Sequence, residues 1–125
     1  MANLAAPLGR ILMSLIFILG GLGKLAALAA TGTYMQSMGI PAILALPAAL
    51  FELFAGLAIL LGWRTRAVAV ILAGFCIVTA AIFHRNFADQ ITMIMFMKNV
   101  AMAGGFLILA AHGAGGMSLD ARQGR

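Results

Sequence analysis

Four apolar segments, each close to the length that crosses a bilayer, constrain this chain more than any other feature. They run approximately over residues 8–30, 41–61, 67–83 and 91–111. A hydrocarbon core about 30 Å thick needs roughly 20 helical residues to span it. Because 64% of the 125 residues are hydrophobic and only 9% are charged, a soluble core of this size could not bury the apolar surface. The sequence therefore predicts an integral membrane protein.

The segments between the apolar runs are short, which limits how the helices can be arranged. Residues 31–40, 62–66 and 84–90 are long enough only to join neighbouring helices that run in opposite directions. We expect an all-α, membrane-embedded antiparallel four-helix bundle with up-down-up-down topology, a single domain over residues 1–125, and a short cytoplasmic tail over residues 112–125. Pro47 lies inside the second apolar segment and should either kink that helix or mark a delayed start.

The basic residues indicate an orientation. The formal charge is +5, but these residues stand singly between apolar segments and form no basic run, so we expect no binding to nucleic acid. Under the positive-inside rule, their bias places both termini in the cytoplasm of a multi-pass protein of the cell (inner) membrane, with Arg64 and Arg66 as cytoplasmic-side basic anchors. The basic residues on the cytoplasmic side are Arg10, Arg64, Arg66, Arg122 and Arg125. The opposite side has Arg85.

Polar residues inside the spans are the strongest candidates for a functional site, because a charge within a spanning helix costs at least a few kcal/mol. These residues are Lys24, Glu52, Lys98 and Asn99. At 1.5 Å per residue, the distances from the outer ends of the helices are roughly 9 Å for Lys24, 16 Å for Glu52 and 10 Å for Lys98. We expect Glu52 to pair with Lys24, Lys98 or both, and Asn99 to form a hydrogen bond across the bundle. His84, together with Arg85, would close the site on the outer side.

Two interpretations of this polar set stay open. It could be an ion-pair network that sets the helix register, or it could be a ligand pocket or proton path. If all three charged groups are ionised, the set carries +1, and a surplus cation in a low dielectric requires an anion, a carbonyl oxygen or a lowered pKa. A quinone carbonyl, a small anion or a lipid phosphate would meet that need. Four phenylalanines could form an apolar wall for a quinone or could be ordinary packing: Phe17, Phe51, Phe54 and Phe96.

Metal and haem sites are not expected. Cys76 is the only cysteine, so one chain can form no dithiol and no internal disulfide. His84 and His112 should lie about a membrane thickness apart, so one haem iron cannot bind both. In the methionine-rich fourth segment, only Met93 and Met97 share a helix face. No haem, flavin or metal is therefore expected, and a quinone stays the possible cofactor.

The order of several short motifs resembles the DoxX-like family of small four-helix membrane proteins, over nearly the whole chain. The motifs are GRILMSLIFILGGLGKL (residues 9–25), ELFAGLAILLGWRTR (52–66), the histidine that closes the third helix (His84), KNVAMAGGFLIL (98–109) and HGAGGMSLDA (112–121). The resemblance implies a four-helix fold found alongside thiosulfate:quinone oxidoreductase subunits and membrane oxidoreductase complexes. The family's polar positions match Lys24, Glu52, Arg64 or Arg66, His84, Lys98 and Asn99 here.

Three functions follow as hypotheses. The first is a membrane subunit of a quinone-linked redox system, without autonomous catalysis, in which Lys24 or Lys98 polarises a carbonyl and Glu52 relays protons. The second is a non-enzymatic membrane scaffold or assembly factor that binds another membrane protein. The third is a small-solute or anion permease, for which so short a chain would need to form a homo-oligomer. All three share the lipid bilayer as a partner.

Overall fold

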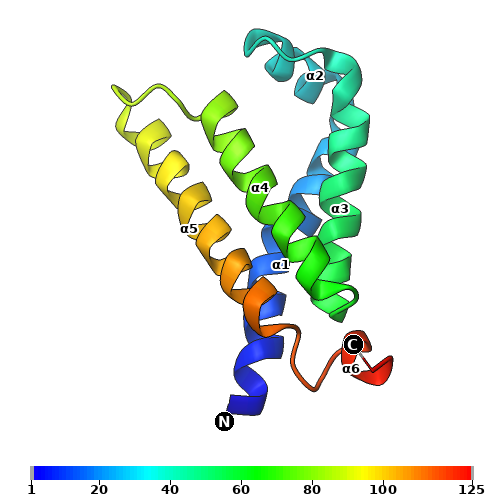
Figure 1. The fold of residues 1–125 in the computed structure, drawn as a ribbon. Helices are drawn as coiled ribbons and strands as arrows, with labels where there is room; N and C mark the ends of the chain where they lie inside the picture. Colours follow the sequence, from blue (N-terminus) through cyan, green and yellow to red (C-terminus); the bar gives the residue numbers. More distant parts are fainter. Residues whose placement is uncertain (1, 125) are drawn as a thin grey trace.

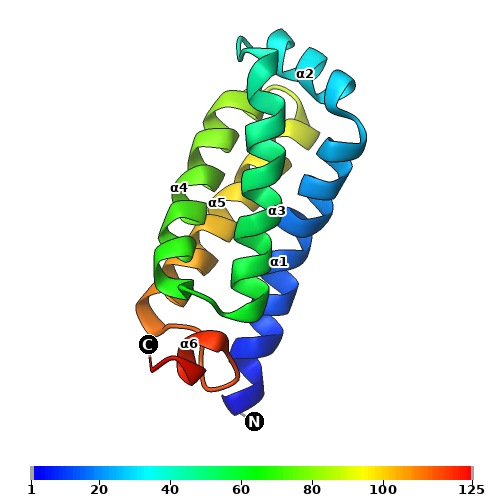
Figure 2. The same cartoon turned by 90° about the vertical axis from the view of Figure 1, so that its right-hand side faces the viewer.

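The computed structural model describes residues 2–124, with side chains from Leu4 onward. This part of the chain is helical and contains no strand, and four of its helices are long and apolar enough to cross a membrane. The predicted all-α four-helix bundle is confirmed, and both termini lie at the same end of it (Figure 2). The elements are α1 (Ala2–Ala26), α2 (Leu28–Ser37), η1 (Ala42–Leu44), α3 (Ala45–Leu61), α4 (Thr65–Phe83), α5 (Gln90–His112) and α6 (Leu119–Arg122).

The four long helices form two closely packed pairs. Helix α1 lies along α3, and α4 lies along α5. Helices α3 and α4 follow each other in the chain but contact each other much less, and Figure 1 shows them diverging from the turn that joins them. The bundle therefore consists of two helix pairs that cross each other.

Small residues bring α1 and α3 close together. A Cβ atom added to Gly21 would lie 2.7 Å from the backbone nitrogen of Leu53 and 2.8 Å from the carbonyl oxygen of Ala49. A Cβ atom on Gly56 would lie 2.9 Å from Cγ1 of Ile18. In lipid, where apolar side chains gain little by leaving their solvent, such close contact is a main source of helix association.

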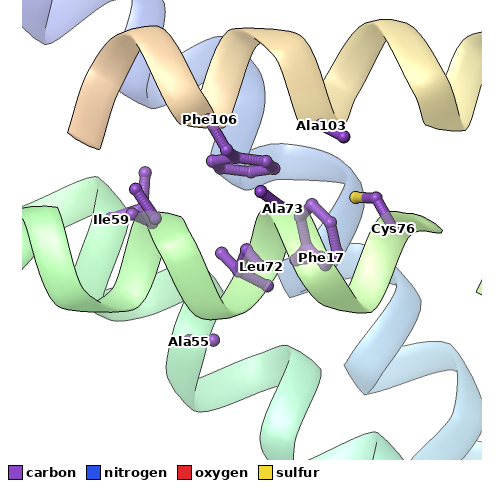
Figure 3. Packing of buried hydrophobic residues seen from close by; sticks show 9 residues of the cluster. Phe17, Ala55, Ile59, Leu72, Ala73, Cys76, Ala103 and Phe106 are labelled. Atoms are coloured by element: carbon purple, nitrogen blue, oxygen red, sulfur yellow. The ribbon is translucent and has the colours of Figure 1, made fainter. Parts of the chain in front are cut away.

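One hydrophobic cluster joins the two pairs. The rings of Phe17 from α1 and Phe106 from α5 meet edge to face with centroids 5.5 Å apart, and Leu72 and Cys76 of α4 are buried in the same cluster. Figure 3 shows side chains from all four long helices pointing into this cluster. Phe106, Leu72 and Ile59 of α3 are fully buried. These contacts hold the crossing in place.

The first helix ends earlier than expected. It stops at Ala26 and not near residue 30, because Ala27 adopts φ −139° and ψ 51° and breaks the helix. The chain then forms α2 over much of the expected loop, and Gly32 of α2 packs closely on Ala42 of η1. The continuous apolar sequence LAALAA carries no proline or polar residue that would mark this break.

Pro47 marks a delayed helix start, one of the two expected alternatives. Helix α3 begins at Ala45, so Pro47 lies in its first turn, where a backbone N–H has no partner within the helix. The preceding 3-10 turn extends the apolar span to Ala42–Leu61, which is 20 residues. Helix α4 begins two residues before the expected position, and α5 is one residue longer at each end.

The segment expected as a tail folds back on the bundle. It contains the short helix α6, which lies against the end of the bundle where the chain starts (Figure 2). The backbone N–H of Asp120 donates a hydrogen bond of 2.8 Å to the carbonyl oxygen of Gly62, in the turn between α3 and α4. Arg125 lies outside the described residues.

Candidate functional site

An ion pair between α1 and α3 lies at the centre of the candidate site. The Nζ atom of Lys24 lies 2.7 Å from Oε2 of Glu52. Glu52 is 7% exposed, whereas the side chain of Lys24 is 35% exposed. The pair therefore has a buried anionic side and a cationic side that is open at the surface of the bundle.

The two partners come from different depths. Lys24 lies in the last turn of α1, where the helix dipole favours a cation. It is therefore two residues from the end of its helix and not at the expected depth of about 9 Å. Glu52 lies ten residues after Ala42 and nine before Leu61, near the middle of its span. The long lysine side chain brings its charge inward to meet the carboxylate.

A glycine leaves space beside the pair. A Cβ atom added to Gly20 would lie 3.3 Å from Oε1 of Glu52 and 3.9 Å from Nζ of Lys24. No side chain of α1 therefore covers the carboxylate at this point. This glycine allows α1 to pass close to the ion pair without crowding it.

Asn99 forms the predicted hydrogen bond across the bundle. Its Nδ2 donates to the carbonyl oxygen of Cys76 at 3.1 Å and to Oγ1 of Thr79 at 3.0 Å. Both acceptors belong to α4, so Asn99 joins α5 to α4. The structure therefore gives Asn99 a role within this helix pair, and its side chain donates to α4 and not to Glu52.

Lys98 and His84 take no part in the ion pair. Lys98 is exposed on α5 and forms no ion pair or hydrogen bond with any residue that the structure describes. Of the two lysines expected to meet Glu52, the structure brings only Lys24 to it. His84 is half-buried at the end of α4, and Arg85 beside it is exposed.

The four phenylalanines expected as a quinone wall do not form one wall. Phe17 and Phe51 both pack on Phe75, with ring centroids 6.3 and 5.0 Å apart. Phe96 instead packs edge to face on Phe87, at 5.0 Å. These rings fill helix contacts, and Phe54 is exposed.

A second polar cluster, at the end of the bundle with both termini, was not anticipated. Arg10 is only 3% exposed. Its guanidinium donates to the carbonyl oxygens of Ile59 at 3.3 Å and Leu60 at 3.1 Å, and also to that of Met117. This side chain therefore joins the first helix to the end of α3 and to the C-terminal segment. The signal in the sequence was an arginine at the start of the first apolar segment, two residues after Leu8.

Asp120 completes this cluster. Its carboxylate accepts hydrogen bonds from the backbone N–H groups of Arg64 at 2.6 Å and Thr65 at 2.8 Å. A residue 55 positions later in the chain thus caps the start of α4. We name Arg10, Asp120 and their backbone partners the terminal lock. Asp120 is one of only three acidic residues in the chain, so the sequence offers few carboxylates that could lie near a buried arginine.

The two predicted basic anchors lie beside the terminal lock. Nη1 of Arg66 donates to the carbonyl oxygens of Ala110 at 3.3 Å and Ala111 at 2.8 Å, at the end of α5. The guanidinium of Arg64 lies 5.4 Å from the ring centroid of Trp63. Among residues 2–124, no three His, Cys, Asp or Glu side chains form a group that could hold a metal ion.

These features define a class: a small membrane protein with four apolar helices and a Lys–Glu ion pair between the first and third of its long helices, α1 and α3. The family model DoxX matches residues 5–85, about two thirds of the chain, and the chain belongs to the DoxX family.

Two relatives come from Escherichia coli (strain K12). "Inner membrane protein YqjF" is 47% identical over 111 residues, covering 89% of this chain and 85% of the relative. "Inner membrane protein YphA" is 39% identical over 122 residues, covering 92% and 87%. No solved structure matches the chain. Together with the four apolar helices, these relatives identify a multi-pass inner membrane protein in contact with the lipid bilayer.

Proposed function

We propose that this chain is a membrane subunit of a quinone-linked redox system and that the Lys24–Glu52 pair binds the quinone headgroup. The observation that carries this proposal is a buried glutamate, whose side chain is 9% exposed, paired at 2.7 Å with a lysine whose side chain is 35% exposed. The exposed ammonium is a donor that can bind a carbonyl oxygen. The carboxylate behind it can accept or release a proton.

The surroundings of the pair favour a ligand that arrives through the lipid. Lys24 reaches the surface of the bundle within the apolar region, where a quinone can keep its isoprenoid tail in the bilayer and place its headgroup against the ammonium. Reduction of a quinone to a quinol takes two electrons and two protons. In this proposal a redox partner supplies the electrons, and Glu52 passes protons to the bound headgroup.

The test compares quinone content between matched variants. The protein is purified in native lipid particles, extracted with organic solvent, and the extract is measured by chromatography with mass detection. We expect close to one quinone per chain in the wild type and a loss of roughly tenfold in Lys24→Met and Glu52→Gln, the effect of losing about one charge-assisted hydrogen bond. Lys98→Met is the control, because it removes a lysine that lies outside the pair. A wild type without quinone, or an equal loss in the control, would overturn the proposal.

A second function, a membrane scaffold, is favoured by Lys98. This lysine is exposed on a membrane-spanning helix and has no partner among the residues that the structure describes. A charge in that position gains most from a polar group on another membrane protein. We expect Lys98→Met to release a co-purifying partner and Lys98→Arg to retain it, as measured by native mass spectrometry, with quinone content unchanged in both variants. Retention of the partner by Lys98→Met would reject this function.

The same proposal places both termini in the cytoplasm. Arg10, Arg64 and Arg66 belong to the end of the bundle that carries both termini, and Arg85 belongs to the opposite end. The positive-inside rule assigns the more basic end to the cytoplasm. A C-terminal alkaline phosphatase fusion should be inactive and a green fluorescent protein fusion fluorescent, and the reverse result would invert the orientation.

A further inference from the structure

A cavity of about 470 Å³ lies at the end of the bundle that carries both termini. It is formed where α4 begins, where α5 ends, and along the glycine-rich stretch 113–116. Its charged lining residues are Arg64, Arg66 and Asp120, and His112 also lines it. The cavity shares no lining residue with the Lys24–Glu52 pair, so the proposed quinone site does not account for it.

The charges around the cavity leave a surplus of positive charge. Two arginines and one aspartate line it, which gives a formal net charge of +1 with His112 counted as neutral. The carboxylate of Asp120 already accepts hydrogen bonds from the backbone N–H groups of Arg64 and Thr65. It is therefore engaged in capping α4, and the arginine side chains remain available to an added anion.

Contacts within the chain hold the two arginines in place. Nη1 of Arg66 donates to two carbonyl oxygens at the end of α5, while its Nε and Nη2 form no hydrogen bond with any described residue. That free edge runs along Gly113, where an added Cβ atom would lie 3.1 and 3.2 Å from Nη2 and Nε. Arg64 lies over Trp63, and its own side chain donates no hydrogen bond in the described part of the chain. A fixed guanidinium with a free two-nitrogen edge suits an oxyanion with two oxygens to offer.

We propose that this cavity binds a phosphate group between Arg64 and Arg66, and that the headgroup of an anionic phospholipid supplies it. The cavity is at the level where the apolar spans end, beside the exposed ring of Trp63, which is typical of the bilayer interface. The rest of its lining consists mainly of alanine and glycine, including Ala67 and Ala114, which leaves room for a headgroup. The surplus positive charge selects an anionic lipid over a zwitterionic one.

The test measures lipid retention by native mass spectrometry on the full-length protein in detergent, with phosphatidylglycerol, phosphatidylcholine and inorganic phosphate as probes. The wild type should retain one phosphatidylglycerol. Arg64→Gln should reduce its affinity on the order of fivefold, and Arg64→Gln combined with Arg66→Gln about twentyfold or more. Arg85→Gln is the matched control, because it removes the same charge from an exposed arginine at the opposite end. Arg66→Lys keeps the charge but loses the planar fork, so its affinity should lie between the wild type and the double variant.

Each outcome decides the proposal. Retained phosphatidylglycerol that millimolar inorganic phosphate does not displace supports a lipid headgroup, whereas displacement by inorganic phosphate supports the same site with free phosphate as its ligand. The proposal is overturned if neither phosphatidylglycerol nor inorganic phosphate is retained, if phosphatidylcholine is retained equally well, or if Arg85→Gln shows an equal loss. Because Arg66→Gln also removes hydrogen bonds to α5, circular dichroism checks the fold of each variant. If the double variant unfolds, the affinity of the single variant Arg64→Gln decides the proposal.

Discussion

Lys24 and Glu52 neutralise each other inside a membrane span, and this mutual dependence distinguishes them from the other charged residues. Neither carries an isolated charge while the 2.7 Å contact persists. Removing one partner leaves the other without its counter-charge, whereas removing both leaves no charge in that region. The structure therefore predicts that the two residues are strongly coupled in stability measurements.

A double-mutant cycle on this pair tests that coupling. Lys24→Met should lower the free energy of unfolding by about 2–3 kcal/mol, somewhat less than the 3–5 kcal/mol typical of fully buried pairs, because Lys24 is partly exposed. The combined variant Lys24→Met with Glu52→Gln should recover most of that loss. Thermal unfolding in native lipid particles measures the stability of the single and the combined variants. Additive effects of the two substitutions would show that the residues do not depend on each other.

Among single residues, the sequence predicted that Glu52 pairs with Lys24, Lys98 or both and that Asn99 forms a hydrogen bond across the bundle. It did not predict that Lys98 is exposed, and it named no partner for Asn99. Helix α5 has apolar residues on all sides, so its pattern does not define which face points inward. The structure shows an inward face that carries Asn99, Ala103 and Phe106. Lys98 precedes Asn99 by one residue, which corresponds to a rotation of about 100° around the helix, and it is exposed.

At the scale of whole helices, the sequence predicted the four spans because their length and hydropathy follow from the thickness of the bilayer. It could not predict α2 or the docking of the C-terminal segment. The break at Ala27 lies within a uniformly apolar run, and the hydrogen bonds of Asp120 join residues 55 and 56 positions apart. Such features arise from tertiary contacts, which local patterns do not report.

The packing of α1 on α3 predicts opposite effects for two neighbouring glycines. Gly21→Ala should destabilise the protein by about 1–3 kcal/mol, because the new Cβ atom would meet the backbone of α3 at 2.7 and 2.8 Å. Gly23→Ala is the control, since a Cβ atom there meets nothing within 4 Å. Because alanine favours helix, this control should be neutral or stabilising by up to about 1 kcal/mol. An equal fall in the melting temperatures of Gly21→Ala and Gly23→Ala would contradict the close α1–α3 packing.

Two capping aspartates allow a second comparison between helices. Asp120→Ala should lower stability by about 0.5–2 kcal/mol, because it removes the buried carboxylate that caps α4. Asp89→Ala removes the exposed cap of α5, where water can take over the hydrogen bonds, and should have a smaller effect. Limited proteolysis should also show faster cleavage after residue 112 in Asp120→Ala only. Unchanged cleavage in that variant would mean that the C-terminal segment is held by other contacts.

Across the whole molecule, lipid replaces water as the solvent for most of the surface, and this changes the effect of a surface charge. Ile71 is 55% exposed, three residues from the middle of α4, and Met117 is 61% exposed in the C-terminal segment beyond the spans. Ile71→Asp should cost about 2.5–3.5 kcal/mol and lower the amount of protein in the membrane. Met117→Asp should have little effect. Equal membrane levels of the two variants would place the exposed face of α4 outside the lipid.

The contact between Arg10 and the carbonyl oxygen of Met117 also has a consequence for biosynthesis. A ribosome makes the first helix long before residue 117, so the guanidinium of Arg10 lacks one of its acceptors until Met117 has been added. The terminal lock can close only after residue 120 has been synthesised. A chain that stopped between residues 112 and 117 would contain all four long helices and still leave Arg10 without this acceptor and α4 without its cap.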